Sequence, residues 1–128
     1  MSIDRFEGHR YLNLETFRKS GEGVRTPVWF VREGHTLHVW TLADSGKVRR
    51  IRRNSRVRIA PCTVSGRLLG DWVAAHAEVD GSPEALRHVS RLMRSKYGIA
   101  FLLFAWVGRL QRARYTTLRI HVEKDPAE

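Results

Sequence analysis

The residues best suited to chemistry lie in one short basic segment. It places the hydroxyl groups of Thr41 and Ser45 before Gly46, which is followed by Lys47 and, three positions later, by Arg50. The residues after Ser45 have a helical pattern, and the first turn of a helix offers an anion free backbone N–H groups and partial positive charge. Lys47 and Arg50 share one face of such a helix and can contact the same phosphate. The segment therefore predicts a phosphate-binding site, and the alternative is a basic helix face that is simply solvated.

The other side chains that commonly carry catalysis are scattered. Of the six histidines only His35 and His38 are close, and on a strand these two point to opposite faces, so we expect structural roles for all six and no metal site. The single cysteine, Cys62, excludes an intramolecular disulfide and a multi-cysteine metal site. No serine lies in the context of a hydrolase nucleophile. We therefore expect no side chain to act as acid, base or nucleophile.

Alternating patterns predict the strands that position the basic segment. Residues 24–32 alternate between two faces, and the turn-forming residues 20–23 join them to residues 11–19 as a β-hairpin. Alternation of the same kind predicts further strands over residues 35–41, 56–62, 69–79 and 115–123.

Helical patterns appear at two places. Val48 and Ile51 are three apart among polar neighbours, which indicates a short surface helix over residues 46–54 with these two side chains buried. Ser82 and Pro83 are a strong helix start, and the helix that they begin is expected to run to about residue 97, with a second one after Gly98.

Together these elements predict the fold class. Five or six antiparallel strands with few helices favour a mainly β (α+β) fold, a small β-barrel. A length of 128 residues with 42% hydrophobic composition is that of one domain, which we expect to span residues 1–128.

Charge and hydropathy limit the partners. The formal net charge is +10, from 23 basic and 13 acidic side chains, so the surface attracts polyanions, either nucleic acid or a phosphorylated cofactor. The first ten residues contain no apolar leader. The longest apolar stretch, residues 99–107, is shorter than the roughly 20 residues of a membrane span. We expect a cytoplasmic protein with no membrane partner, in which residues 99–107 form a buried or interface helix.

Four segments of the first half of the chain resemble the pyridoxamine 5′-phosphate oxidase-like superfamily, and within it the small oxidoreductases that use coenzyme F420, a deazaflavin. They occur in the order and spacing of that superfamily, whereas the second half of the chain is similar only in pattern. The segments are YLNLETFR at 11–18, VRTPVWFV at 24–31, ADSGKVRRIRRN at 43–54 and VRIAPC at 57–62.

This resemblance implies a split β-barrel of the FMN-binding-protein type with short peripheral helices. It also implies a homodimer with two cofactors in the subunit interface. The residues implied to contact the cofactor fall into three groups. The ring system is assigned to Arg25, Thr26, Pro27, Val28 and Trp29; the phosphate to Thr41, Ser45, Gly46, Lys47 and Arg50; and the pocket floor to Ala60 and Pro61, with Trp72 as a possible cover.

The resemblance implies an oxidoreductase that transfers a hydride to or from a small organic substrate, with the hydride chemistry supplied by the cofactor. Coenzyme F420 is favoured because its tail carries a phosphodiester and glutamates, which a basic rim would complement. That rim would consist of Arg49, Arg52, Arg53, Arg56 and Arg58, unless these side chains serve only to solvate the surface.

Three alternatives remain open. The first is an FMN-dependent oxidoreductase of the pyridoxamine phosphate oxidase type. The second is a nucleic-acid-binding module, because seven basic residues lie between Lys47 and Arg58 and tryptophans can stack on bases; this reading leaves the Ser-Gly-Lys helix start unexplained, so nucleic acid is not the expected partner. The third is a carrier that holds a cofactor without catalysis.

Overall fold

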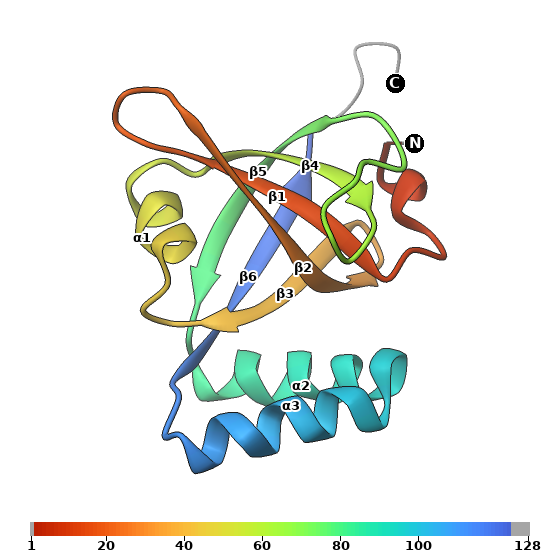
Figure 1. Ribbon diagram of the computed structural model, residues 1–128, viewed down its shortest axis with the longest axis vertical. Coiled ribbons are helices and arrows are strands. Elements are labelled where there is room, and N and C mark those ends of the chain that lie inside the picture. The colour runs from red at the N-terminus through yellow and green to blue at the C-terminus, as the bar shows by residue number, and fades with distance from the viewer. Residues whose placement is uncertain (1, 124–128) are drawn as a thin grey trace.

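The structure is a computed structural model that describes residues 2–123 (Figure 1), so the last five residues of the expected domain lie outside the described part. Six antiparallel strands close a barrel in the order β1-β2-β3-β6-β5-β4. This arrangement confirms the expected mainly β barrel with peripheral helices. In chain order the elements are η1 Ser2–Phe6, β1 Tyr11–Phe17, β2 Gly23–Glu33, β3 Thr36–Leu42, α1 Gly46–Arg53, β4 Arg56–Cys62, β5 Val73–Asp80, α2 Pro83–Tyr97, α3 Ile99–Leu110 and β6 Tyr115–Val122.

The barrel interior is filled by alternate side chains of the strands. On β2, Val28 and Phe30 point inward, as the alternation predicted. Leu37 and Val39 of β3 do the same and are fully buried. The intervening residues of these strands face outward, and this outer surface forms the candidate site.

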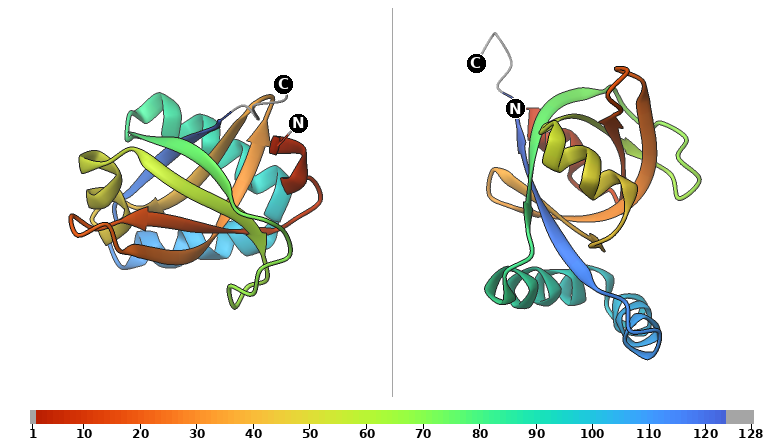
Figure 2. Two further views of the ribbon diagram at one scale, coloured as in Figure 1. Left: turned by 90° about the horizontal axis from the view of Figure 1, so that it is seen from above. Right: turned by 90° about the vertical axis from the view of Figure 1, so that its left-hand side faces the viewer.

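The three helices cover the barrel in two places. Helix α1 lies across one end (Figure 2), with Val48 and Ile51 buried as predicted. Helices α2 and α3 lie side by side along the outside of the barrel (Figure 1), and α2 contacts β2, β3 and β6. Helix α2 begins as expected at Ser82, whose hydroxyl accepts a hydrogen bond from the Ala85 N–H at 3.2 Å.

The barrel is split between β2 and β3. Strand β1 pairs with β2 from Gly23 to Trp29, but β3 pairs only with the segment from Phe30 to Glu33. Among the strands of residues 2–123, none pairs with the second edge of the segment from Val24 to Trp29, so its backbone N–H and C=O groups are available to water or a ligand.

Several element boundaries differ from the sequence-based predictions. Strand β5 begins at Val73 instead of residue 69, because residues 63–72 form a loop that folds back along β4, with the Leu69 N–H donating to the Pro61 carbonyl at 2.8 Å. Strand β1 ends at Phe17 instead of residue 19, because the turn already begins at Arg18, whose N–H donates to the Glu22 carbonyl.

The helix η1 was not predicted; it is held by the burial of Ile3 and Phe6. Helix α3 is exposed on much of its surface in the single chain, so of the two expectations for residues 99–107 a buried helix is wrong for the monomer. Across residues 2–123, no helix has both the length and the apolar character that crossing a membrane requires.

Candidate functional site

A cleft of about 320 Å³ lies where β2 and β3 separate. It brings together six of the residues proposed from the sequence to contact a cofactor. It also includes four that were not proposed. The first six are Thr26, Pro27, Val28, Trp29, Thr41 and Lys47, and the other four are Tyr11, Trp40, Leu42 and Phe104.

Lys47 lines this cleft, and Arg50 lies near Lys47 on the same helix. The Lys47 ammonium donates to the Thr41 hydroxyl at 3.4 Å, and the Arg50 guanidinium donates from Nε to the Thr16 hydroxyl at 2.7 Å. Within the described residues, neither side chain has a carboxylate at ion-pair distance. Burial, together with the nearby Arg50 charge, lowers the pKa of Lys47 below its usual value. Charges held in this way favour an anion as their missing partner.

The start of α1 offers further donors. Ser45 occupies the N-cap position, yet its side chain makes no capping hydrogen bond. Its Oγ atom is buried and has no hydrogen-bond partner within the described part of the chain. A Cβ atom on Gly46 would lie 2.8 Å from Nη1 of Arg50, so a larger residue there would displace the end of the Arg50 side chain. The helix start, the free hydroxyl and the two cations together form a site suited to a phosphate group.

The unpaired edge of β2 forms one side of the cleft. The segment from Thr26 to Trp29 lines it and has backbone groups available for hydrogen bonding. Trp29 is held in place because its ring stacks on Tyr97 at 4.6 Å between centroids. The Tyr97 hydroxyl accepts from the Phe30 N–H at 3.0 Å and donates to the Arg10 carbonyl at 2.7 Å. The cleft therefore combines a fixed aromatic wall with a row of backbone groups that can bind a planar heterocycle.

Three of the proposed contact residues lie away from this cleft. Arg25 donates to the buried carboxylate of Glu15 at 2.9 Å. Ala60 and Pro61 are buried on β4, in the region covered by the loop 63–72. In the single chain, Ala60 and Pro61 therefore do not line this cleft.

Trp72 and part of the expected basic rim belong to another cluster. The guanidinium groups of Arg25 and Arg58 each lie 4.9 Å from the centroid of the Trp72 ring. Arg58 also binds Glu15, at 2.5 Å. Burial of Glu15 tends to raise the pKa of its carboxyl group, but hydrogen bonds from Arg58 and Arg25 outweigh this effect and lower it. Since Arg58 already shares the Glu15 carboxylate with Arg25, Arg58 is less suited to an anionic tail than Lys47.

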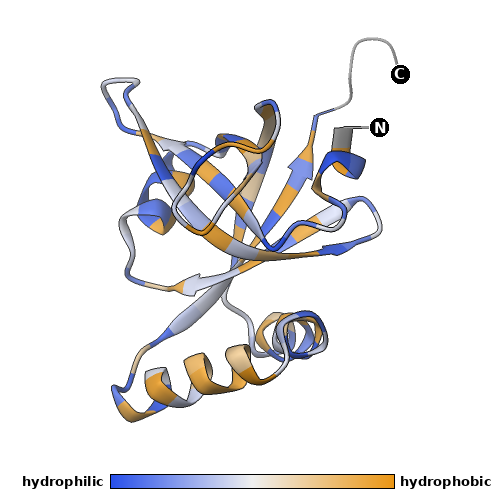
Figure 3. Cartoon of the chain, turned by 45° about the vertical axis from the view of Figure 1, so that its right-hand side comes forward, coloured by the Kyte–Doolittle hydropathy of each residue, from blue (hydrophilic) through white to orange (hydrophobic). Residues whose placement is uncertain are grey.

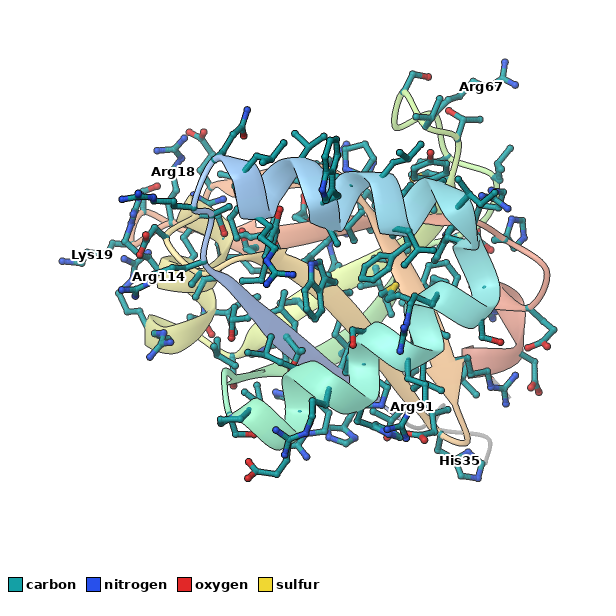
Figure 4. The ribbon with its side chains drawn as sticks, turned by 90° about the horizontal axis from the view of Figure 1, so that it is seen from below. Arg18, Lys19, His35, Arg67, Arg91 and Arg114 are labelled. Atoms are coloured by element: carbon teal, nitrogen blue, oxygen red, sulfur yellow. The ribbon has the colours of Figure 1, made fainter. Side chains whose placement is uncertain are left out.

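A second hollow, of about 510 Å³, adjoins the cleft and shares Leu42 and Phe104 with it. Ser45, Arg112 and Arg114 also line it. Arg114 lies at the connection between α3 and β6, at the end of the molecule occupied by α1 (Figure 4). Ser45 was proposed from the sequence, whereas sequence reasoning missed Phe104, Arg112 and Arg114 because their position depends on how α3 packs. Among the lining residues that were not proposed, Trp40 and Leu42 could have been found from the sequence, since alternation places them on one face of β3.

No protein-family model and no curated protein matches the sequence. Solved structures do match. A conserved hypothetical protein, Rv2991 from Mycobacterium tuberculosis, is 23% identical with a TM-score of 0.72, over 96% of this chain and 79% of that one. The heme storage protein HutZ from Vibrio cholerae is 17% identical with a TM-score of 0.72, over 97% and 89%. An F420 reductase is 14% identical with a TM-score of 0.61, over 94% and 92%.

These identities are low, so the likeness concerns the fold, and proteins that share it carry different functions. The chain has the split β-barrel fold of the pyridoxamine 5′-phosphate oxidase-like proteins.

Proposed function

We propose that this protein is an oxidoreductase that binds coenzyme F420 in the cleft between β2 and β3. The proposal depends on one observation: Lys47, Arg50 and the Ser45 hydroxyl surround the start of α1 without an anionic partner among the described residues. A phosphate placed there would satisfy all three groups. The fold supports the proposal, because an F420 reductase has the same one.

Each side of the cleft has a distinct role in this proposal. The unpaired edge from Thr26 to Trp29 orients the ring system by hydrogen bonds to its polar edge. Trp40 and Phe104 pack near it and exclude water. The bound cofactor supplies hydride transfer to or from a small organic substrate. The protein contributes binding, orientation and exclusion of water, with no side chain required to exchange a proton.

The second hollow favours the deazaflavin over FMN. FMN ends at its phosphate, whereas the tail of coenzyme F420 continues through a phosphodiester to glutamates. Beyond Ser45 the hollow is lined by Arg112 and Arg114, which would bind those carboxylates. This placement replaces the rim first expected along α1 and β4, where Arg58 is already paired with Glu15.

In this proposal the protein acts as a homodimer. In the single chain the cleft is open, and Phe104 at its border belongs to the same helix as a row of exposed apolar side chains. A second chain packed against α3 would cover this row and enclose the cofactor.

The test is a parallel fluorescence titration of the purified protein with coenzyme F420 and with FMN. We expect tighter binding of coenzyme F420, and we expect the double variant Arg112→Ala/Arg114→Ala to weaken its binding while leaving FMN affinity unchanged. Tighter FMN binding would favour the FMN-dependent alternative. If neither molecule binds, the proposed function is wrong. Cofactor binding without reduction of any acceptor would favour a carrier.

A further inference from the structure

Three potential metal ligands converge on the outside of the barrel, apart from the proposed cofactor cleft. They are Glu33 at the end of β2, His38 on β3 and His88 on α2, and their ligand atoms all lie within 4.8 Å of one another. Nε2 of His38 is 2.9 Å from Oε1 of Glu33. Nε2 of His88 is 2.9 Å and 2.8 Å from the two oxygens of the same carboxylate. Each imidazole therefore directs its own Nε2 atom at the Glu33 carboxylate.

This donor set matches the preference of late divalent transition metals. Two imidazoles and a carboxylate are the protein ligands of many zinc sites that keep a fourth position for water. Tetrahedral bonds of about 2.0–2.1 Å place donor atoms about 3.3 Å apart. The nitrogen–oxygen separations of 2.8–2.9 Å are shorter than this value, and all ligand atoms lie within 4.8 Å of one another, so rotation of the half-exposed Glu33 and His88 side chains would admit the ion.

The surroundings leave space for the fourth ligand. A hollow of about 260 Å³ is lined by both histidines and by Ser82 and Glu84. Glu84 lies one helical turn before His88, on the same face of α2. Arg119 also borders the hollow, but its guanidinium lies 3.5 Å from carboxylates of Glu78 and Asp80, which offset its charge. The hollow can therefore hold a water molecule bound to the ion.

The backbone holds the three donors in place. Glu33 and His38 flank the tight turn between β2 and β3, and both strands continue into the barrel. His38 is buried, whereas Glu33 and His88 are about half exposed, so an ion can enter from solvent. Structural roles were expected for all six histidines because they are scattered in the sequence. Glu33 and His88 are 55 positions apart, and only the packing of α2 on the barrel brings them together.

The geometry points to a Zn²⁺ site formed by Glu33, His38 and His88, with its fourth position open to the hollow beside Ser82 and Glu84. The bound ion would link α2 to the β2–β3 hairpin and so fix the helix pair over the barrel. Since this hollow and the cofactor cleft share no lining residue, the inference is independent of the proposed function.

The test uses full-length, tag-free protein that has been treated with a chelator. Zn²⁺ is titrated in competition with a chromophoric chelator, and Co²⁺ is then bound to record the visible absorption of a four-coordinate site. We expect one Zn²⁺ per chain. His88→Ala should weaken binding by more than about 100-fold, because losing even an outer-shell partner costs 10–100-fold, and Glu33→Gln should abolish the Co²⁺ spectrum.

A matched control is His76→Ala, which removes a different exposed histidine, one that bonds a glutamate at 2.9 Å. It should bind Zn²⁺ like the unchanged protein. Circular dichroism without metal verifies that each variant is folded. The inference is overturned if the unchanged protein binds less than one equivalent, if His88→Ala and Glu33→Gln bind normally, or if His76→Ala loses binding equally.

Discussion

At the scale of single residues, the site is characterised by groups whose charge or hydrogen-bonding capacity is unmatched. Glu15 shows the contrast, because its buried carboxylate has two arginine partners, Arg25 and Arg58. Within residues 2–123, the side chains of Lys47 and Arg50 are hydrogen-bonded only to hydroxyl groups, at Thr41 and Thr16. Uncompensated cations of this kind lower stability unless a ligand supplies the opposite charge. They therefore distinguish a binding site from a structural ion-pair network.

The first prediction concerns Lys47→Ala. Removal of its ammonium group should weaken cofactor binding by about 1.5–3 kcal/mol, the usual contribution of a charged hydrogen bond. Fluorescence titration measures this change. Arg52→Ala is the matched control, because Arg52 is an exposed cation on the same helix and should bind with unchanged affinity. Equal affinities for Lys47→Ala and the unchanged protein would show that the phosphate does not bind at this position.

The second prediction concerns pH. Burial, reinforced by Arg50, lowers the pKa of Lys47 in the free protein below its usual 10.5, whereas a bound phosphate favours the protonated amine. Affinity for the cofactor should therefore be full at neutral pH and should fall as pH rises through this lowered pKa. In Lys47→Arg the charge persists, so titrations across the alkaline range should show a nearly constant affinity. Parallel profiles for the two proteins would contradict the assignment.

At the scale of elements, sequence patterns correctly predicted the buried positions and the helix cap that depend on neighbouring residues. The alternation of Val28 and Phe30, the buried pair Val48 and Ile51, and the Ser82 cap were all correctly predicted, since each depends on residues close in sequence. The basic segment from Thr41 to Arg50 was recognisable for the same reason, and its binding of a phosphate stays a prediction.

Features that depend on long-range packing could not be predicted. The split between β2 and β3 depends on which residues of β2 pair with β3. The contribution of Phe104 to the cleft depends on where α3 packs. The loop before Val73 replaced an expected part of β5 because it folds back along β4. None of these features leaves a periodic signal in its own segment.

The third prediction tests how α3 is seated. A Cβ atom on Gly108 would overlap the Tyr115 hydroxyl group and approach its ring, so Gly108→Ala should push α3 away from the barrel. Overpacking of this kind costs about 1–3 kcal/mol, partly offset by about 1 kcal/mol of helix propensity. Urea denaturation should show a net loss of stability. Arg109→Ala, at the neighbouring exposed position, is the control and should change stability by less than about 0.5 kcal/mol.

At the scale of the whole molecule, α3 carries large apolar side chains that are exposed in the single chain. It is apolar over most of its length (Figure 3). Phe101 packs inward, while Ile99, Leu103 and Trp106 are 74%, 57% and 60% exposed. A helix that is apolar on all sides is normally buried, and exposed apolar patches mark interaction sites. A second copy of the chain is the occupant that agrees with the proposed function, because the stripe continues to Phe104 at the border of the cleft.

The last prediction follows from this surface. Leu103→Glu places a charge in the middle of the exposed stripe, but Leu103 does not line the cleft, so the monomer fold and the phosphate site should be retained. Light scattering during size-exclusion chromatography should show a dimer for the unchanged protein and a monomer for the variant. Arg91→Glu, which alters an exposed residue of α2 (Figure 4), should remain dimeric.

Because the partner chain would enclose the cofactor, the monomeric variant Leu103→Glu should also bind the cofactor more weakly. A dimer that survives Leu103→Glu would place the interface elsewhere, and the cleft would then need another cover.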